Sequence, residues 1–110
     1  MNPKKRYYVR YMTVNIAKSA HLDLLDGYTF YENQKKDLGD YFLKILFSDI
    51  DSLADTAGIH HLYFHYHRKL SHTFPFAIYY KVKNDAVYVY AILDCRKKSS
   101  WIKNKIGALS

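Results

Sequence analysis

The sequence predicts an α+β fold in which a helical hairpin packs on one face of a twisted antiparallel sheet. Apolar side chains recur at spacings of three and four through residues 16–53, as on the buried face of a helix, and with a period of two in the later part of the chain. Only two prolines and four glycines interrupt these patterns. The chain of 110 residues has the usual size of one domain, so we expect a single domain over residues 1–110 in the order β-α-α-β-β-β.

Residues 5–13 are expected to form the first strand, since their side chains alternate between two faces. An amphipathic helix is predicted over residues 16–34. Its apolar positions are Ala20, Leu24, Leu25, Tyr28 and Tyr31, and its solvent side is expected to carry Asp23, Asp26 and Glu32. Gly27 lies inside this helix and would allow a close approach of the neighbouring helix.

A second helix is predicted after a short polar joint at residues 35–37. Its apolar positions are Leu38, Phe42, Ile45, Leu46, Ile50 and Leu53. Asp37 is the expected N-cap, and Gly58 is the expected end. Because the joint is so short, the two helices must lie antiparallel.

Three strands are predicted in the second half of the chain. The first begins at Ile59 and would place His61, His65 and His67 on one face together with Lys69. The other two span residues 74–83 and 86–94, and Asn84-Asp85 is a typical turn between them.

The last two predicted strands carry apolar residues on both faces. On the final strand, Val87, Val89, Ala91 and Leu93 are expected to share one face. Two helices can cover only one face of such a sheet. The reverse face, with its tyrosines, is therefore either open to a partner or made of amphipathic residues with solvated hydroxyl groups.

Charge is divided unevenly along the chain. Residues 11–55 carry four cations and eight carboxylates, whereas the rest carries thirteen cations against Asp85 and Asp94. This division favours a surface for a polyanion or an acidic partner, although a basic domain without such a partner has the same composition. No apolar run is long enough to span a membrane, and the first residues lack a signal-peptide pattern, so we expect a cytoplasmic protein.

An ordered set of short motifs resembles the RelE/ParE superfamily of toxins from bacterial type II toxin–antitoxin modules. The most distinctive is FPFAIYYKV at residues 74–82, which is similar to the family's "FPY-x-I-x-Y-x-V" strand. Residues 87–93 resemble the next strand of the family, and Arg96-Lys97 followed by Trp101 resembles its "R-R-x-x-x-W" end. Further similarity lies in YENQ at residues 31–34, in Leu38-Gly39 with Phe42, and in Arg68-Lys69.

The resemblance implies a growth-inhibiting toxin that a cognate antitoxin holds silent. In this family the antitoxin wraps over the toxin and often adds a strand or helix, a mode that would cover an apolar reverse face. We therefore expect Tyr79, Tyr88 and Tyr90 to bind the antitoxin. An acidic antitoxin would also complement the positive charge.

The resemblance leaves two chemistries open. RelE-like members cleave mRNA on the ribosome, and such a nuclease would use Arg68, Arg96 and Lys97, with His65 and His67 as weaker acid–base candidates. ParE-like members poison DNA gyrase and catalyse no reaction, and Lys69, Lys98 and Trp101 would then contact the target.

We favour the ParE-like reading because RelE-like nucleases carry a Tyr or His near the C-terminus, whereas this chain has neither after Tyr90. Trp101 stands in that region, and its indole cannot act as an acid or base near neutral pH. No cofactor is expected, and no metal, because few carboxylates and no cysteine lie near the histidines. A third possibility, from another class, is a basic RNA-binding module or an inactive relative of these toxins.

Overall fold

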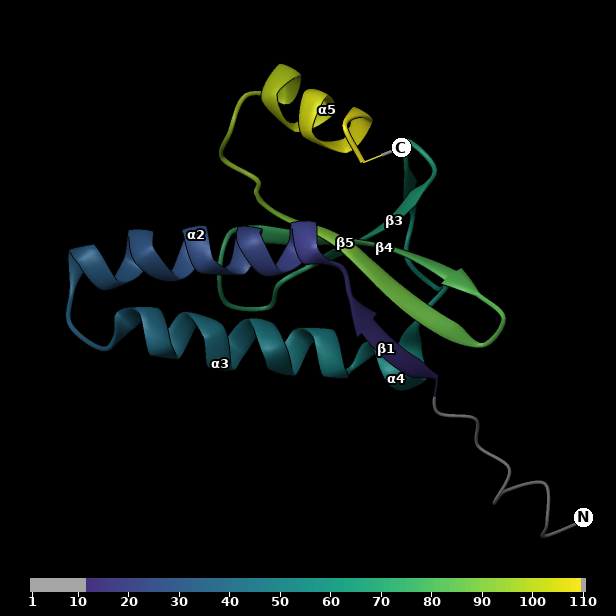
Figure 1. The fold of residues 1–110 in the computed structure, drawn as a ribbon, viewed down its shortest axis with the longest axis horizontal. Coiled ribbons are helices and arrows are strands. Elements are labelled where there is room, and N and C mark those ends of the chain that lie inside the picture. Colours follow the sequence, from purple (N-terminus) through teal and green to yellow (C-terminus); the bar gives the residue numbers. More distant parts are fainter. Residues whose placement is uncertain (1–11, 110) are drawn as a thin grey trace, which may run out of the picture.

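A computed structural model of the protein describes residues 12–109. Its elements are β1 (Thr13–Ile16), α2 (Lys18–Gln34), α3 (Leu38–Asp51), α4 (Leu53–Thr56), β2 (Leu62–Tyr63), β3 (Tyr66–Leu70), β4 (Phe76–Lys83), β5 (Ala86–Asp94) and α5 (Ser99–Gly107) (Figure 1). The strands form one sheet in the order β1-β5-β4-β3-β2. Within this part of the chain, no helix has the length and apolar character needed to cross a membrane.

The predicted α+β architecture, with a helical hairpin on one face of the sheet, is confirmed. Most of the strand predicted at residues 5–13 lies outside the described residues. The strand that is described begins at Thr13 and pairs with β5 in parallel. The sheet is therefore mixed, and the prediction of a purely antiparallel sheet is wrong.

Two glycines let α2 and α3 pack closely. A Cβ atom added to Gly27 would lie 2.5 Å from the Phe42 ring, and one added to Gly39 would lie 2.7 Å from Tyr28. Both distances are too short for any larger residue without a shift of the neighbour. The predicted close approach at Gly27 is confirmed.

The joint between the two helices is organised by Glu32. Its carboxylate accepts hydrogen bonds from the backbone N–H groups of Asp37 and Gly39, both at 3.0 Å. Asp37 itself has a left-handed backbone, with φ of 69°, and makes no side-chain cap. Asp37 is the N-cap residue of α3, as predicted, but its side chain makes no capping hydrogen bond, and the Glu32 carboxylate accepts from the backbone donors at this end of the helix instead.

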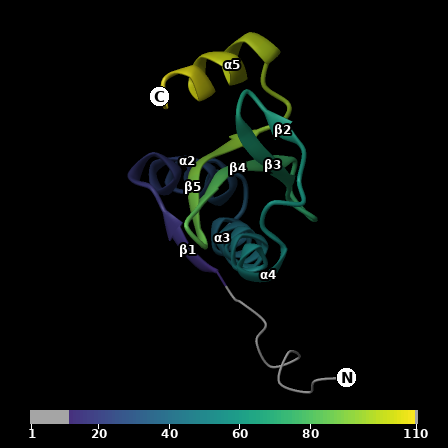
Figure 2. The same ribbon diagram turned by 90° about the vertical axis from the view of Figure 1, so that its right-hand side faces the viewer.

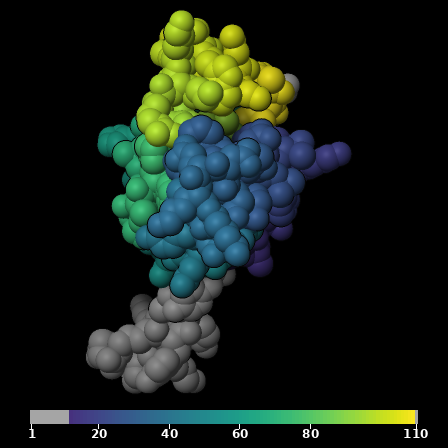
Figure 3. All heavy atoms as spheres, turned by 90° about the vertical axis from the view of Figure 1, so that its left-hand side faces the viewer, coloured from purple at the N-terminus to yellow at the C-terminus, as the bar shows by residue number. Residues whose placement is uncertain are grey.

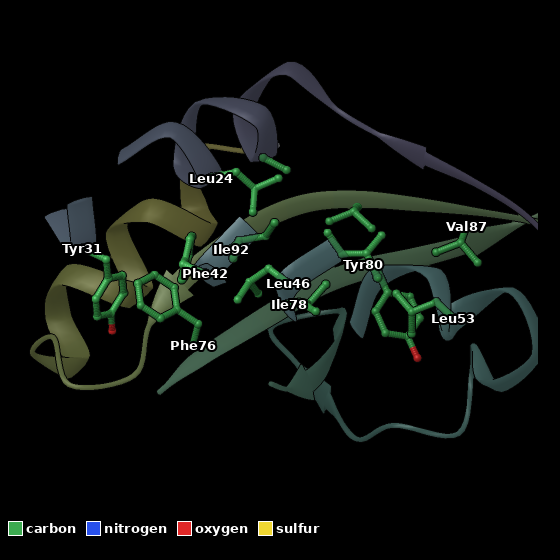
Figure 4. Close-up of a cluster of buried hydrophobic side chains, with 13 residues drawn as sticks. Leu24, Tyr31, Phe42, Leu46, Leu53, Phe76, Ile78, Tyr80, Val87 and Ile92 are labelled. Atoms are coloured by element: carbon green, nitrogen blue, oxygen red, sulfur yellow. The ribbon is translucent and has the colours of Figure 1, made fainter. Parts of the chain in front are cut away.

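The main core lies between the helical hairpin and the sheet (Figure 4). At one end the rings of Tyr31, Phe42 and Phe76 pack together, with the Phe42 and Phe76 centroids 5.0 Å apart. Leu24 belongs to this core, whereas Leu25 is 57% exposed and its predicted packing is wrong.

A bulge in β5 changes which side chains face the helices. Tyr79 pairs with Ala91 and Tyr80 pairs with Val89, so Tyr90 is an extra residue opposite β4. Val87 and Val89 pack towards the helices, but Ala91 and Leu93 lie on the reverse face. The expectation that these four residues share one face is wrong, because the extra residue reverses the alternation. The predicted turn at Asn84-Asp85 is confirmed, with positive φ at both residues.

The reverse face of the sheet is covered by α5. Ile102 and Ile106 are buried against Ala77, Tyr79 and Leu93, which form a second core. Figure 2 shows α5 on the opposite side of the strands from α3. The prediction of an open reverse face is thus wrong, and Tyr79 is only 1% exposed.

Residues 62–70 form a tight hairpin rather than the single strand predicted from Ile59. Leu62 pairs with His67 and Tyr63 pairs with Tyr66, so Phe64 and His65 make the turn. Both turn residues have positive φ, 48° and 72°. His65 is therefore in a turn, and the expected face shared by three histidines and Lys69 does not form.

Candidate functional site

A groove of about 270 Å³ lies where α2, the end of β5 and α5 meet. Its lining includes the apolar Ile92 and Leu93, and Gly27 contributes on the α2 side. Figure 3 shows the C-terminal segment directly above the helical hairpin on this side of the molecule. Lys97, in the cationic segment after β5, lines this groove together with Trp101, so we treat it as the candidate site.

Asp23 lies at the inner wall of the groove. Its carboxylate accepts a hydrogen bond of 2.9 Å from the backbone N–H of Ile92, next to the bulge in β5. Burial raises the pKa of Asp23 to about 6, although this hydrogen bond and the charge of Lys105 lower it. The prediction that Asp23 lies on the solvent side is therefore wrong.

The outer rim of the groove combines aromatic rings with ammonium groups. The Nζ atoms of Lys97 and Lys105 lie 5.4 and 5.3 Å from the centroid of the Trp101 ring. Across the groove, Phe30 is 48% exposed, and Asp26 lies beside it on α2. An apolar side chain of a partner could enter between these rims, with opposite charges available on the two sides.

Arg96 is held by Asp94 and points towards α2. Its guanidinium donates to both carboxylate oxygens of Asp94, at 2.9 and 2.8 Å, and to the Tyr31 hydroxyl at 3.5 Å. Burial would raise the pKa of Asp94, yet its bonds with Arg96 hold this pKa below the ordinary value. The bidentate pair leaves less of the Arg96 charge available to a ligand.

Arg68 lies on the other side of the sheet. It donates to the Tyr79 hydroxyl at 3.2 Å and approaches the Cys95 sulfur at 3.5 Å. Burial raises the pKa of Tyr79, although the bond from Arg68 opposes this shift. Arg68 and Arg96, which the nuclease reading expected to act together, therefore point to opposite faces.

The two histidines proposed for acid–base chemistry do not share contacts with Arg68, although His67 precedes it on β3. His65 is exposed in the β2–β3 turn. His67 stacks on Tyr80, and its Nδ1 bonds the backbone oxygen of His60 at 2.7 Å. The Tyr80 hydroxyl also bonds His60, whose pKa is lowered by burial and by the charge of Lys69. Residues 12–109 contain no cluster of three or more side chains that could hold a metal ion.

The other residues named from sequence are dispersed. Lys98 is exposed just before α5, and Lys69 is half-buried on β3. Tyr88 and Tyr90 are half-buried on β5, and the Tyr90 ring contacts that of Tyr66. Of the residues named from sequence, the groove brings together Lys97, which was predicted for the nuclease alternative, and Trp101, which was predicted to contact the target.

Asp23, Phe30 and Lys105 are among the groove residues that sequence reasoning missed. A signal existed for each of them. Asp23, Gly27 and Phe30 are spaced as on one helical face, and Trp101 and Lys105 are one helical turn apart. Their meeting required the position of α5, which no local pattern specified.

No protein-family model and no curated protein matches the sequence. Among solved structures, the fold is similar to a chain of the "Chromosomal ParDE TA system from P. aeruginosa", with a TM-score of 0.62 and 18% sequence identity. The match covers 74% of this chain and 94% of that chain. The fold that the RelE/ParE resemblance implied is thus confirmed.

Proposed function

We propose that this chain is the toxin of a type II toxin–antitoxin module, that a cognate antitoxin neutralises it, and that it acts as a ParE-like poison of DNA gyrase. The observation that carries the proposal is the fold shared with a chain of a ParDE system over nearly all of that chain. The motifs from YENQ at residues 31–34 to Trp101 support the same assignment independently.

The arrangement of charged groups supports a toxin that binds its target rather than one that cleaves RNA. A nuclease needs cations and a proton-transferring group around one phosphate. Here Arg68 contacts Tyr79 on the reverse face, whereas Arg96 is paired with Asp94 near α2. His67 is stacked on Tyr80 among the residues facing the helices.

The groove beside α5 is the surface that we assign to the antitoxin. Phe30 and Trp101 offer aromatic surface on opposite rims, and the lysines beside Trp101 suit an acidic partner. The helix α2 extends this surface with Leu22 and Leu25, which are 52% and 57% exposed. We no longer assign Tyr79 to antitoxin binding, because α5 covers its side chain.

Two assays with the purified chain test the proposed activity. The first measures supercoiling of plasmid DNA by gyrase, and the second follows intact mRNA in a translating extract. We expect inhibition of supercoiling with no new mRNA ends. Cleavage of mRNA that is lost in Arg68→Ala or Arg96→Ala would instead establish the nuclease function and overturn ours.

Expression in bacteria separates activity from neutralisation. We expect the chain alone to stop growth, and the protein encoded next to it to restore growth and to copurify with it. Trp101→Ala and Phe30→Ala should weaken copurification, whereas Lys83→Ala, an exposed change at the far end of β4, should not. Harmless expression of the wild-type chain would remove support from both toxin functions.

A further inference from the structure

A second cavity, of about 350 Å³, opens on the opposite side of α5 from the groove described above. It lies between the β2–β3 turn, β4 and the end of α5, and it is lined by Phe64, His65, Tyr66, Lys81, Lys103, Ile106 and Gly107. No carboxylate is among these residues, whereas two aspartates of α2 and Asp94 line the first groove. The second cavity therefore has only neutral and cationic walls.

The turn that carries Phe64 holds an unfavourable backbone. Phe64 and His65 both have positive φ, at positions where Asn and Gly are preferred. A bulky residue in this region costs on the order of 1 kcal/mol. The turn nevertheless places Phe64 in the lining of the cavity, where this residue is 52% exposed.

The aromatic ring is supported on one side and approached by a cation on another. The edge of Phe64 packs against Tyr63, with centroids 4.7 Å apart and planes at 79°. The Lys103 ammonium lies 5.9 Å from the Phe64 centroid, and Lys81 lies 4.5 Å from that of Tyr66. Tyr66 is only 5% exposed, so Phe64 is the ring that remains accessible to a ligand.

We propose that this cavity binds one nucleotide unit of single-stranded nucleic acid, with the base stacked on Phe64 and the phosphate between Lys81 and Lys103. An exposed ring next to cations, without carboxylates, is the combination that binds unpaired nucleotides through stacking and charge. RNA and DNA share this chemistry, so the cavity does not by itself select one of them. The inference concerns a different face from the candidate antitoxin groove and does not rest on the proposed function.

Binding is measured by fluorescence anisotropy of labelled oligonucleotides with the full chain. The probes are oligo-U and oligo-dT of roughly ten nucleotides, within the range that small domains cover, and a duplex of the same length. We expect both single strands to bind. The affinity for the duplex should be lower by a factor of about ten or more, because its bases are not free to stack.

Three variants localise the binding. Phe64→Asn removes the ring and places a residue that favours the turn, so the fold is preserved, and it should weaken single-strand binding about tenfold. Gly107→Glu and Gly107→Lys place opposite charges at the rim, where an added Cβ meets open space. The glutamate should weaken binding, whereas the lysine should preserve or strengthen it.

The salt dependence gives a separate readout for the phosphate contact. Lys103→Met should reduce the slope of log affinity against log salt by about 0.7, the value for one single-strand phosphate. Equal binding by wild type and Phe64→Asn, or equal affinity for duplex and single strand, would overturn the proposal. Equal competition by a poly-glutamate peptide would also overturn it, because the cavity would then recognise acidic peptide rather than a nucleotide.

Discussion

At the residue scale, two carboxylates near one groove illustrate how surroundings decide the behaviour of the same group. Asp94 is paired with Arg96 in a bidentate arrangement, and its pKa lies below the ordinary value. Asp23 lacks a bidentate partner of this kind, and burial raises its pKa to about 6. At neutral pH the charge of Asp23 is therefore present at a cost to the folded state.

Asp23→Asn should stabilise the protein at neutral pH. Because the folded-state pKa is raised, the folded state binds the proton more tightly, and wild-type stability falls as pH rises from about 4 to about 6. Asparagine keeps an oxygen to accept the Ile92 N–H, and we expect a gain of about 1 kcal/mol at pH 7 after solvent screening.

Urea unfolding at pH 4 and pH 7 checks this expectation. The gain should be present at pH 7 and largely absent at pH 4. Asp26→Asn, on the same helix and exposed, makes the same change in net charge and serves as the control. An equal gain in both variants would show that net charge, and not the burial of Asp23, is responsible.

Gly27→Ala should destabilise the protein although alanine favours helices. The new Cβ would lie 2.5 Å from the ring of Phe42, which is fully buried and has no room to move. We expect a loss of about 1–3 kcal/mol in the free energy of unfolding.

The matched control is Gly107→Ala, since a Cβ there has no atom within 4 Å. This variant should gain up to about 1 kcal/mol from helix propensity alone. Thermal unfolding of both variants makes the comparison. A gain in both would mean that the α2–α3 contact can widen without cost.

At the element scale, α5 acts as the cover of the reverse face. It has only nine residues, too few to be helical alone in water, so its stability comes from packing. Ile102 and Ile106 bury against the second core, which the sheet by itself would expose. The helix also forms one wall of both cavities, and their shapes therefore depend on its position.

Ile106→Ala should loosen α5 before the rest of the protein unfolds. Ile106 is 3% exposed, and removal of its side chain is expected to cost about 2–4 kcal/mol. Hydrogen exchange should increase across α5 while α3 stays protected. Asn104→Ala, on the exposed face, should leave exchange in α5 unchanged, and equal protection of α5 in Ile106→Ala would contradict this role.

The elements that the sequence predicted well are those with strong local patterns. The helix end at Gln34 and the strand over residues 86–94 agree with the structure, because periodicity and turn residues mark them directly. The hairpin at Phe64-His65 was hidden, since it contains neither glycine nor asparagine and continues the alternation of a strand.

The bulge at Tyr90 and the helix α5 depend on contacts between distant segments, which no window of sequence contains. For the same reason the site was predicted only in part. Trp101 and Lys97 could be named from the chain end, but the half-buried position of Asp23 could not.

At the scale of the whole molecule, charge is divided between two layers. The eight carboxylates of residues 11–55 lie in the α2–α4 region, whereas nine of the cations follow Gly58 and lie in the sheet and around α5. Such a separation directs a polyanion or an acidic partner to the side formed by the sheet and α5. The affinity for a polyanion should therefore depend on where a charge lies in the structure, and not only on the net charge of the protein.

Lys98→Glu and Lys44→Glu make the same change in net charge at exposed positions in the two layers. Lys98 directly precedes α5, where a carboxylate is compatible with the helix N-terminus, so the helix should be preserved. Lys44 lies on α3 among the carboxylates. The salt concentration that elutes the protein from heparin should fall clearly for Lys98→Glu and little for Lys44→Glu. The reason is that salt of about 0.1 M screens the attraction between a side-chain charge and heparin beyond about 10 Å. Equal shifts for the two variants would mean that heparin responds to total charge, and the assignment of one binding side would be wrong.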